Sequence, residues 1–410
     1  MVSWVKRHKR LVIGLAVVGV VAAVTAVWAL VIREVEPENP TAFYDPPDPI
    51  PSDPPGTIVR SEPIDRAPAG ASATLVMYTS TDPAGTPIAV TGVVFAPSGA
   101  VPEDGRPVVA WAHGTSGVAS RCAPSLLPRG GRANIPELES FLDAGVVVVA
   151  TDYPGLGTPG PHPYLVGESE GRAVLDSVRA AQNVVGEDAG SKVTVFGHSQ
   201  GGHSTIYAAE IAPTYAPELD LVAVAAMAPP TNLAELVVAD EGSVSGVLLT
   251  ALAIDSWSHY YPDTPANAIV HEEFIAPIRD LARKCIFTND QDLVDVPDIV
   301  ELRDRFLSTN PVEQPAWKPH FAANTPTEAP LPVPLLVAQG SIDEIVKPDV
   351  TRAYVERECA AGGNVEYKTY PEAGHFAVRT VAAPDVRDWM LARLDGQPAS
   401  SDCPIPASTG

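Results

Sequence analysis

The sequence predicts an α/β fold, in which a mostly parallel sheet is covered by helices on both faces. Short β-branched and apolar runs recur along the chain and alternate with segments whose apolar residues have helical spacing. One strand–turn–helix unit, at 192–212, carries the pentapeptide Gly-His-Ser-Gln-Gly. Residues 231–328 break the alternation with helical patterns alone, which indicates an insertion into the sheet domain.

The N-terminal segment 1–32 predicts a membrane anchor. Basic residues at 6–10 precede an uninterrupted apolar run at 11–32, which is long enough to cross a bilayer with its N-terminus inside. A cleaved signal peptide, with 27–29 as its cleavage motif, is the alternative, and either segment exports the rest of the chain. Residues 33–55, rich in proline, are expected to link this segment to the main domain.

The main domain is expected to begin at Gly56 and to occupy 56–230 and 329–410. Alternating runs at 73–79 and 86–95 predict an antiparallel hairpin around the Asp-Pro-Ala-Gly turn at 82–85. The expected strands then lie at 107–112, 144–151, 192–196, 221–227, 332–339 and 365–370. The expected helices lie at 169–186, 202–211, 348–360 and 384–394, with those of the insertion at 233–238, 246–253, 274–284 and 297–307.

The pentapeptide at 197–201 predicts a nucleophile elbow. A buried strand precedes it and a helix, expected to stop near Pro213, follows it. Glycine at both flanking positions lets strand and helix pass closely, while the serine takes a strained backbone that exposes its hydroxyl. We therefore expect Ser199 to be a catalytic nucleophile.

A serine hydroxyl needs a base, and the base needs a carboxylate that orients it. In an α/β-hydrolase these partners follow in the order serine, acid, histidine. Asp343 comes directly after the strand at 332–339, and His375 follows the strand at 365–370 as the last histidine of the chain. We expect the pair to complete a triad, and we expect Asp152 to be structural because it precedes the serine.

An oxyanion hole needs two N–H donors. The backbone of Gln200, directly after the nucleophile, predicts one of them. The loop after the strand at 107–112 predicts the other, with Thr115 as first choice and Gly114 as second. This mechanism requires no metal or organic cofactor, and no cysteine lies in a zinc-binding spacing.

The formal net charge of −23 argues against a nucleic-acid partner, because phosphates are bound by basic surfaces. The four cysteines, Cys122, Cys285, Cys359 and Cys403, fit an oxidising compartment and allow three disulfide pairings. Two disulfides are expected, with free buried cysteines as the alternative.

The sequence from residue 42 onward resembles the secretory lipase family, the lipase A type of yeasts and its actinobacterial relatives. The matching stretches share their order along the chain, and they are 43–47, 56–61, 121–125, 152–157, 197–202, 228–233, 342–346, 373–375 and 403–407. The sequence departs from the yeast-type enzymes at 113–117, where they have an acidic residue and this chain has His-Gly-Thr-Ser-Gly.

The resemblance implies an α/β-hydrolase body, a helical lid at 231–328 and hydrolysis of carboxylic esters, including acylglycerols. It also implies the triad of Ser199, Asp343 and His375, and the disulfides Cys122–Cys285 and Cys359–Cys403. A short-chain carboxylesterase and an acyltransferase on the same triad remain alternatives, and a non-catalytic binding protein is disfavoured because it would have no need of all three residues.

Overall fold

The computed structural model describes residues 41–65, 67–240, 242–286, 299, 302 and 305–405. The segment 1–32, for which an anchor or signal peptide is predicted, lies outside these residues. So does most of the helix expected at 297–307. In the part of the chain that the structure describes, every helix is too short or too polar to span a bilayer.

A nine-stranded sheet forms the centre of the described structure, in the order β1-β2-β3-β5-β4-β6-β7-β8-β9. The strands are β1 Ile58–Pro63, β2 Ala71–Thr81, β3 Pro87–Pro97, β4 Arg106–Ala112, β5 Val147–Thr151, β6 Ala189–His198, β7 Asp220–Met227, β8 Leu335–Gly340 and β9 Val365–Tyr370. The first three strands and the β3–β5 pair are antiparallel. From β5 to β9 all neighbours are parallel, so the predicted mostly parallel sheet is confirmed.

The predicted hairpin is confirmed as β2–β3, whose strands pair from Ala71 with Pro97 to Thr81 with Pro87. Its turn closes through a hydrogen bond from Gly85 N–H to the carbonyl of Asp82, at 2.9 Å. Gly85 has a φ of +85°, which glycine adopts without a steric penalty. The hairpin extends the antiparallel edge of the sheet, away from the parallel strands that carry the site.

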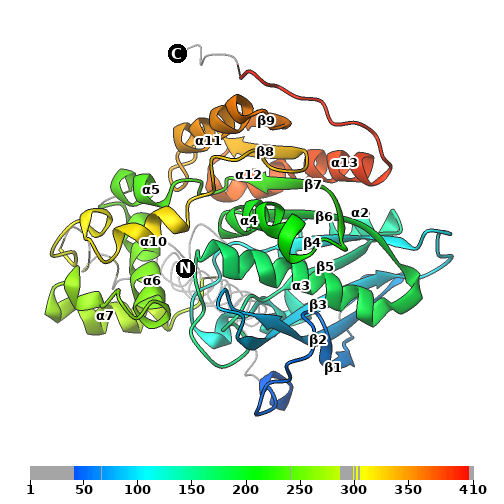
Figure 1. Cartoon of the computed structure of the whole chain (residues 1–410), viewed down its shortest axis with the longest axis horizontal. Coiled ribbons are helices and arrows are strands. Elements are labelled where there is room, and N and C mark those ends of the chain that lie inside the picture. Colours follow the sequence, from blue (N-terminus) through cyan, green and yellow to red (C-terminus); the bar gives the residue numbers. More distant parts are fainter. Residues whose placement is uncertain are drawn as a thin grey trace, which may run out of the picture.

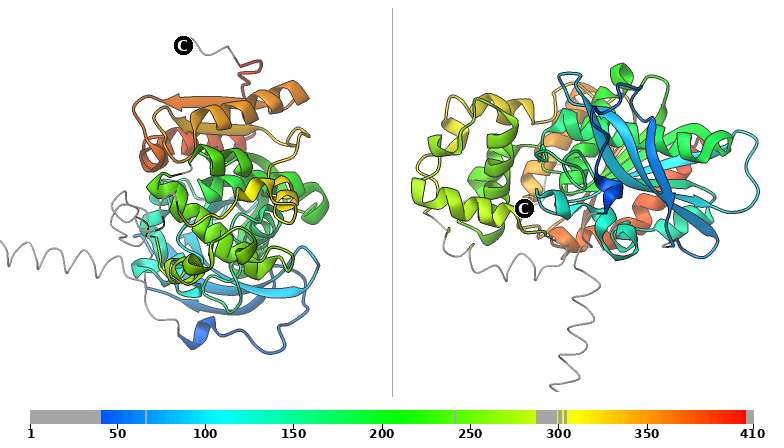
Figure 2. Two further views of the ribbon diagram at one scale, coloured as in Figure 1. Left: turned by 90° about the vertical axis from the view of Figure 1, so that its left-hand side faces the viewer. Right: turned by 90° about the horizontal axis from the view of Figure 1, so that it is seen from below.

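Helices cover both faces of the sheet, with α3 and α4 packed together on one face and α2 and α13 on the other (Figure 2). Their bounds, with those of α11 and α12, are α2 Leu138–Asp143, α3 Gly167–Val185, α4 Gln200–Tyr215, α11 Pro348–Ala361, α12 His375–Val381 and α13 Ala383–Leu394. α4 ends at Tyr215, two residues after Pro213 and so near the expected stop, and Ala216 N–H closes its last turn on the carbonyl of Ala212.

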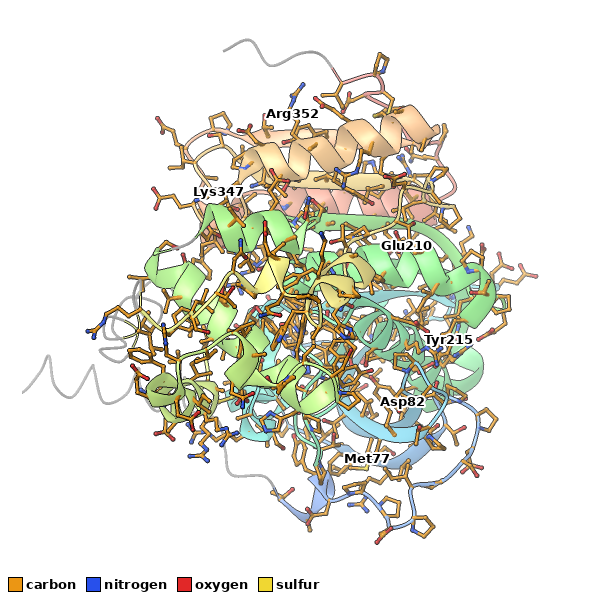
Figure 3. The ribbon with its side chains drawn as sticks, turned by 60° about the vertical axis from the view of Figure 1, so that its left-hand side comes forward. Met77, Asp82, Glu210, Tyr215, Lys347 and Arg352 are labelled. Carbon is orange, nitrogen blue, oxygen red and sulfur yellow. A yellow bond between two sulfur atoms is a disulfide. The ribbon has the colours of Figure 1, made fainter. Side chains whose placement is uncertain are left out.

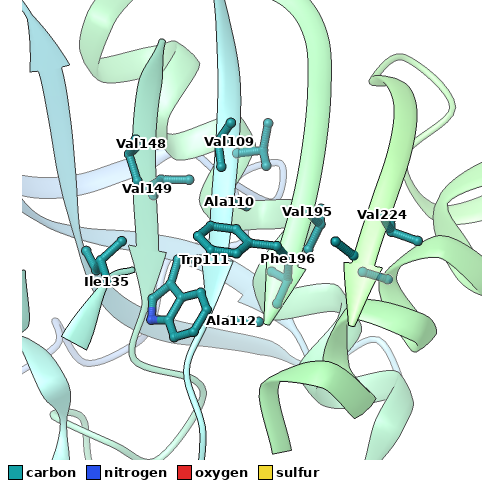
Figure 4. Close-up of a cluster of buried hydrophobic side chains, with 14 of the residues drawn as sticks. Val109, Ala110, Trp111, Ala112, Ile135, Val148, Val149, Val195, Phe196 and Val224 are labelled. Carbon is teal, nitrogen blue, oxygen red and sulfur yellow. The ribbon is translucent and has the colours of Figure 1, made fainter. Parts of the chain in front are cut away.

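The main core lies where the central strands meet the helices on each face. On one face the rings of Trp111 and Phe196 lie 4.7 Å apart between β4 and β6, and Phe141 of α2 packs 5.5 Å from Phe196 (Figure 4). All three side chains are almost completely buried. This packing fixes the ends of β4 and β6, from which the site loops emerge.

The insertion after β7 forms a helical unit beside the carboxyl ends of the parallel strands (Figure 1). Its helices are α5 Leu233–Ala239, α6 Val244–Tyr260, α7 Glu272–Ala282 and α10 Lys318–Ala323. A second hydrophobic core, centred on Trp257 with Trp317 and Phe321 against it, holds these helices together. Most of this core comes from the insertion, and Val118, Tyr164 and Val166 of the main domain complete it. We call the helical insertion the lid.

The segment predicted as a linker does not end where the sequence suggested. Phe43 and Tyr44 form a short 3-10 helix and are buried in the main core. The Tyr44 hydroxyl lies 2.9 Å from Oγ of Ser125. Because these side chains pack on the domain, the domain includes residues before Gly56.

Two disulfides join distant parts of the chain, and they are the two pairs that the family resemblance implies. Cys122 bonds to Cys285, across 163 residues, and connects the main domain to the end of α7 in the lid. Cys359 of α11 bonds to Cys403 and holds the C-terminal segment against the edge of the domain. All four cysteines are therefore oxidised.

Candidate active site

Ser199 stands on a sharp turn between β6 and α4. Its φ of 57° and ψ of −122° place it outside the regions that residues other than glycine favour. A Cβ at Gly197 would lie 2.2 Å from the carbonyl oxygen of Gly201, and one at Gly201 would lie 1.9 Å from that of Ala112. Only glycine fits at either position, which is the local reason for the predicted elbow.

Asp343 lies in the loop after β8, as expected, and it is held by several donors. Its Oδ1 accepts from the N–H groups of Ile345 and Val346, at 2.9 and 2.8 Å, and its Oδ2 accepts from the Gln339 amide at 3.2 Å. The side chain is completely buried. These bonds fix the direction in which the carboxylate faces.

His375 connects Asp343 to Ser199. Its Nδ1 lies 2.9 Å from Oδ2 of Asp343, and its Nε2 lies 2.8 Å from Oγ of Ser199. A carboxylate only accepts hydrogen bonds, so Nδ1–H donates to Asp343 and leaves Nε2 free to accept the serine proton. The structure thus brings the three predicted residues into one hydrogen-bonded chain, with His375 as the first residue of α12 rather than in a loop.

His198 and His203, the two histidines that flank the serine, point away from its hydroxyl. Nε2 of His198 lies 2.8 Å from the carbonyl of His375, and its ring packs 4.7 Å from the His375 ring. Burial, followed by the charges of His375 and Arg379, lowers the pKa of His198 well below its ordinary value. His203 instead lies 2.8 Å from the carbonyl of Asn324 at the end of the lid.

The expected oxyanion donors lie beside Ser199. Gln200 begins α4, where the first N–H groups of a helix have no partner within it. A Cβ on Gly114 would lie 3.6 Å from that of Ser199, so the loop after β4 passes directly over the nucleophile. The hydroxyl of Thr115 lies 2.9 Å from that of Tyr164. The start of α4 and the loop after β4 therefore both lie next to Ser199.

An apolar cavity of about 70 Å³ opens from Ser199 between the sheet and the lid. Aromatic and aliphatic side chains line it, including Leu236, Trp257 and Phe321 of the lid. A smaller cavity of about 20 Å³ also borders Ser199 and is lined by Ile286 and Phe376. The lid thus supplies most of the apolar surface that faces the serine.

The cavity also contains Asp240, a charged lid residue that the sequence analysis did not single out. Its carboxylate pairs with Nζ of Lys347, at 3.0 Å, just beyond the Asp343 loop. Burial raises the pKa of Asp240, and the Lys347 ammonium opposes that rise. The pair ties the end of α5 to the main domain.

Asp152 lies in the structural position that the sequence analysis expected. Its carboxyl group accepts from Ser125, through both N–H and hydroxyl at 2.8 and 2.5 Å, and from the Thr91 hydroxyl at 2.7 Å. Burial raises its pKa to about 6, although these donors lower it. Asp152 therefore joins β3 and β5 to the segment that carries Cys122.

Sequence reasoning missed Glu170 and His162, which lie beneath the nucleophile. Glu170 is completely buried, and its Oε1 accepts from the Gln200 amide at 2.6 Å. A sequence signal existed for it, because Glu170 shares a face of α3 with the buried Ala173 and Val174. His162 lies in an irregular segment and had no such signal. Among the residues that the structure describes, no group of His, Cys, Asp and Glu side chains is arranged to hold a metal ion.

Comparison with known proteins gives a family match. The model of a family described as secretory lipase matches residues 133–402. A Mycobacterium tuberculosis protein named probable inactive lipase is 27% identical over 394 residues, covering 89% of this chain and 85% of that protein. Lipase A of Arthroderma benhamiae is 26% identical over 395 residues, covering 90% of this chain and 82% of its own.

Several solved structures share the fold, and two of them differ in origin and in the reaction their names state. Candida antarctica lipase A in its closed state superposes with a TM-score of 0.75 at 22% identity, covering 90% of each chain. The rice cell wall degrading esterase LipA of Xanthomonas oryzae, in a ligand-bound form, gives a TM-score of 0.68 at 22% identity, covering 84% of this chain and all of that one. These likenesses establish an α/β-hydrolase fold.

Proposed function

This chain belongs to the secretory lipase family, and from that premise we propose that it is an exported serine hydrolase of carboxylic esters, acting as a lipase on acylglycerols. Ser199 is the nucleophile, His375 the general base and Asp343 the carboxylate that orients it. The single observation that carries the proposal is the hydrogen-bonded chain from Ser199 to His375 to Asp343, at 2.8 and 2.9 Å.

In the proposed mechanism Ser199 Oγ attacks the ester carbonyl while Nε2 of His375 takes its proton. Asp343 holds the imidazole in the tautomer that accepts at Nε2, and it stabilises the cation that forms. The N–H groups of Gln200 and of Thr115 or Gly114 stabilise the oxyanion. His375 then protonates the departing alcohol, and a water molecule hydrolyses the acyl-enzyme along the same path.

Two observations favour an active hydrolase with an apolar substrate. The relative from Mycobacterium tuberculosis is named probable inactive lipase, whereas this chain has a serine, a histidine and an aspartate in hydrogen-bonding contact. The cavity beside Ser199 is lined mainly by apolar side chains of the lid, an environment suited to an acyl chain. We therefore propose that residues 231–328 are a lid that contributes the acyl pocket.

Export is the proposed route for this enzyme. Two disulfides are typical of proteins that fold in an oxidising compartment. The basic and apolar segment at 6–32 supplies the export signal, and we propose that it remains as a single-pass anchor with the catalytic domain outside the cell. Retention of the segment would be seen as an intact N-terminus in the mass of the mature protein.

A chain-length series tests the proposal. The full-length protein in mild detergent should hydrolyse p-nitrophenyl esters from acetyl to oleoyl and emulsified triacylglycerol, and Ser199→Ala should reduce the rate by at least about 10⁴-fold. Activity that peaks at long acyl chains supports a lipase. Activity confined to short acyl chains would show that the enzyme is a short-chain esterase and not a lipase. If the protein hydrolyses no ester at all, the proposal is contradicted.

A further inference from the structure

A buried carboxylate lies directly beneath the nucleophile elbow. Glu170, in the first turn of α3, is completely buried and receives hydrogen bonds from three residues on two segments. Its Oε1 accepts from Leu165 N–H at 2.8 Å and from the Gln200 side-chain amide at 2.6 Å. Its Oε2 accepts from the Ser204 hydroxyl at 2.7 Å. Nothing in the ester hydrolysis proposed above uses this group directly.

The contacts of Glu170 fix the side chain that follows the nucleophile. Nδ1 of His162 lies 2.9 Å from the carbonyl of Pro154, so it carries the proton and leaves Nε2 as an acceptor. The Gln200 amide nitrogen lies 3.0 Å from that Nε2 and therefore donates both of its hydrogens, one to His162 and one to Glu170. With its amide held at two points, Gln200 cannot rotate without breaking both bonds.

The same carboxylate also holds the segment next to the second oxyanion loop. Leu165, which donates to Glu170, has a φ of 55° and so a backbone that needs support from its surroundings. The neighbouring Tyr164 bonds through its hydroxyl to that of Thr115, at 2.9 Å. Glu170 thus reaches both sides of Ser199, through Gln200 on α4 and through Tyr164 to the loop after β4.

A purely stabilising role explains this arrangement poorly. Burying a carboxylate costs several kcal/mol unless its oxygens are fully bonded, and an apolar side chain of similar size would avoid that cost. The nearest group that can become cationic is His203, whose Nδ1 lies 3.6 Å from Oε2. The bonds of Glu170 instead come from Gln200, from Leu165 and from Ser204, one turn beyond the elbow.

We propose that Glu170 is a positioning residue for the oxyanion hole. Glu170 holds Gln200 and the 164–165 segment, so that the N–H groups of Gln200 and of the 114–115 loop converge on one point. This inference rests on the ester hydrolysis proposed above. It acts through these residues and does not touch the substrate. Its loss should weaken transition-state binding more than substrate binding.

The test is Glu170→Gln, which keeps the size of the side chain and removes one of its acceptor oxygens. We expect kcat to fall roughly tenfold to a hundredfold, less than the 10²–10³ caused by complete loss of one donor, with KM within about twofold. Affinity for an alkyl trifluoromethyl ketone, which forms a tetrahedral adduct on the serine, should fall by the same factor as kcat/KM. A merely structural residue would not change that affinity.

Glu210→Gln is the matched control. Glu210 lies on α4, the helix that begins with Gln200, about 15 Å further along it, and accepts from the N–H and hydroxyl of Thr327 at 2.7 and 2.9 Å (Figure 3). This change should lower the melting temperature while kcat and the affinity for the ketone stay within about twofold of the wild type. The control thus shows what the loss of a hydrogen-bonded carboxylate does to stability when the oxyanion hole is left unchanged.

If Glu170→Gln lowers the melting temperature but leaves kcat and ketone affinity within twofold, the inference is wrong. If the variant does not fold, Gln200→Met decides, because it removes the amide and keeps the length of the side chain. It should then reproduce the loss of ketone affinity, and an unchanged affinity would overturn the inference. If the wild type hydrolyses no ester, the proposed function is wrong. If the wild type is active and the Glu170 variant is equally active, only the inference about Glu170 is wrong.

Discussion

Ser199 carries backbone strain at the point where its hydroxyl is presented. Its positive φ costs on the order of 1–3 kcal/mol, which the surrounding structure must offset. Two backbone hydrogen bonds hold Ser199. Its N–H donates to the carbonyl of Met227 at 2.9 Å, and its carbonyl accepts from His203 N–H at 3.1 Å. The hydroxyl is thereby kept at the edge of the sheet that faces His375.

Gly201→Ala should destabilise the protein by at least about 3 kcal/mol, because its Cβ would lie 1.9 Å from the carbonyl oxygen of Ala112 and strand and helix would have to separate. Urea denaturation measures the change. Gly70→Ala is the control, since Gly70 has a φ of +79° but open space around it, and it should cost only about 1 kcal/mol. Equal losses for the two variants would show that the close approach at the elbow is not limiting.

His162 makes stability depend on pH. Burial lowers its pKa to about 4, whereas the unfolded chain has a pKa of 6.5 at this position. Because the unfolded state takes up the proton first, the stabilisation is complete above pH 6.5 and is lost as pH falls from 6.5 toward 4. Between pH 7.5 and pH 5 the loss should be about 2 kcal/mol.

Denaturation of the wild type and of His162→Gln at both pH values measures this contribution, and the variant should lose about 2 kcal/mol less on acidification. Asp152→Asn, in contrast, should lose more stability than the wild type on acidification. Burial raises the pKa of Asp152 to about 6, so the folded state gains a proton first and is stabilised as pH falls through 6. If both variants show the acid response of the wild type, the assigned protonation states are wrong.

Among the elements, the sequence was most informative where a pattern was local. The strands β4 to β9 and helices α3, α11 and α13 follow runs of apolar residues, and they were predicted within a few residues. The short elements β1, α2 and α12 were missed. β1 has no buried residue to form an apolar run, and the burial of α2 and α12 depends on neighbours that are distant in the sequence.

The disulfide Cys122–Cys285 links the lid to the loop that approaches Ser199. Ile286 N–H bonds to the carbonyl of Ser116 at 2.7 Å, so the lid segment next to the disulfide lies along this loop. The double variant Cys122→Ala/Cys285→Ala should lower the free energy of unfolding by about 3–5 kcal/mol, because the bond closes a loop of 163 residues. Thermal denaturation without reductant measures this change.

Cys359→Ala/Cys403→Ala serves as the control for this prediction, because it removes a disulfide 44 residues long at the far edge of the domain. Only the first pair should lower the rate of ester hydrolysis, since only it adjoins the 114–116 loop. Unchanged stability after loss of Cys122–Cys285 would contradict the role we assign to that bond.

At the scale of the whole molecule, the protein has two hydrophobic cores. The sheet and its helices form the larger one, and α5, α6, α7 and α10 enclose the smaller one around Trp257. Besides two chain connections and one disulfide, the Asp240–Lys347 pair and hydrogen bonds such as that from Trp257 Nε1–H to the carbonyl of Tyr164, at 2.8 Å, join the lid to the main domain. Because of this division, we expect the lid to move as a unit while the packing of the sheet stays unchanged.

Amide hydrogen exchange should therefore be faster across α5, α6 and α7 than across β4, β6 and β7, because the smaller core opens at a lower free energy. Lys347→Met, which breaks the pair with Asp240, should speed exchange in α5 and leave the central strands unchanged. Equal rates in lid and sheet would show that the two cores unfold together.

The candidate site was predictable as three residues but not as a cavity. Ser199, Asp343 and His375 each follow a strand, and chain order alone placed them at one edge of the sheet. The residues that hold the site in place, such as His162 and Asp240, lie in segments without a sequence pattern. Their contacts form only after the lid has folded against the sheet. Packing between distant segments is what the sequence could not supply.

The central claim is that Ser199 is a nucleophile activated by His375. The most direct measurement is the intact mass of the full-length protein after reaction with an alkyl fluorophosphonate, followed by peptide mapping. We expect one adduct per chain, on Ser199, with no adduct in Ser199→Ala and a strongly reduced rate in His375→Ala. No adduct at all, or an adduct on another residue that forms equally fast without His375, would contradict it.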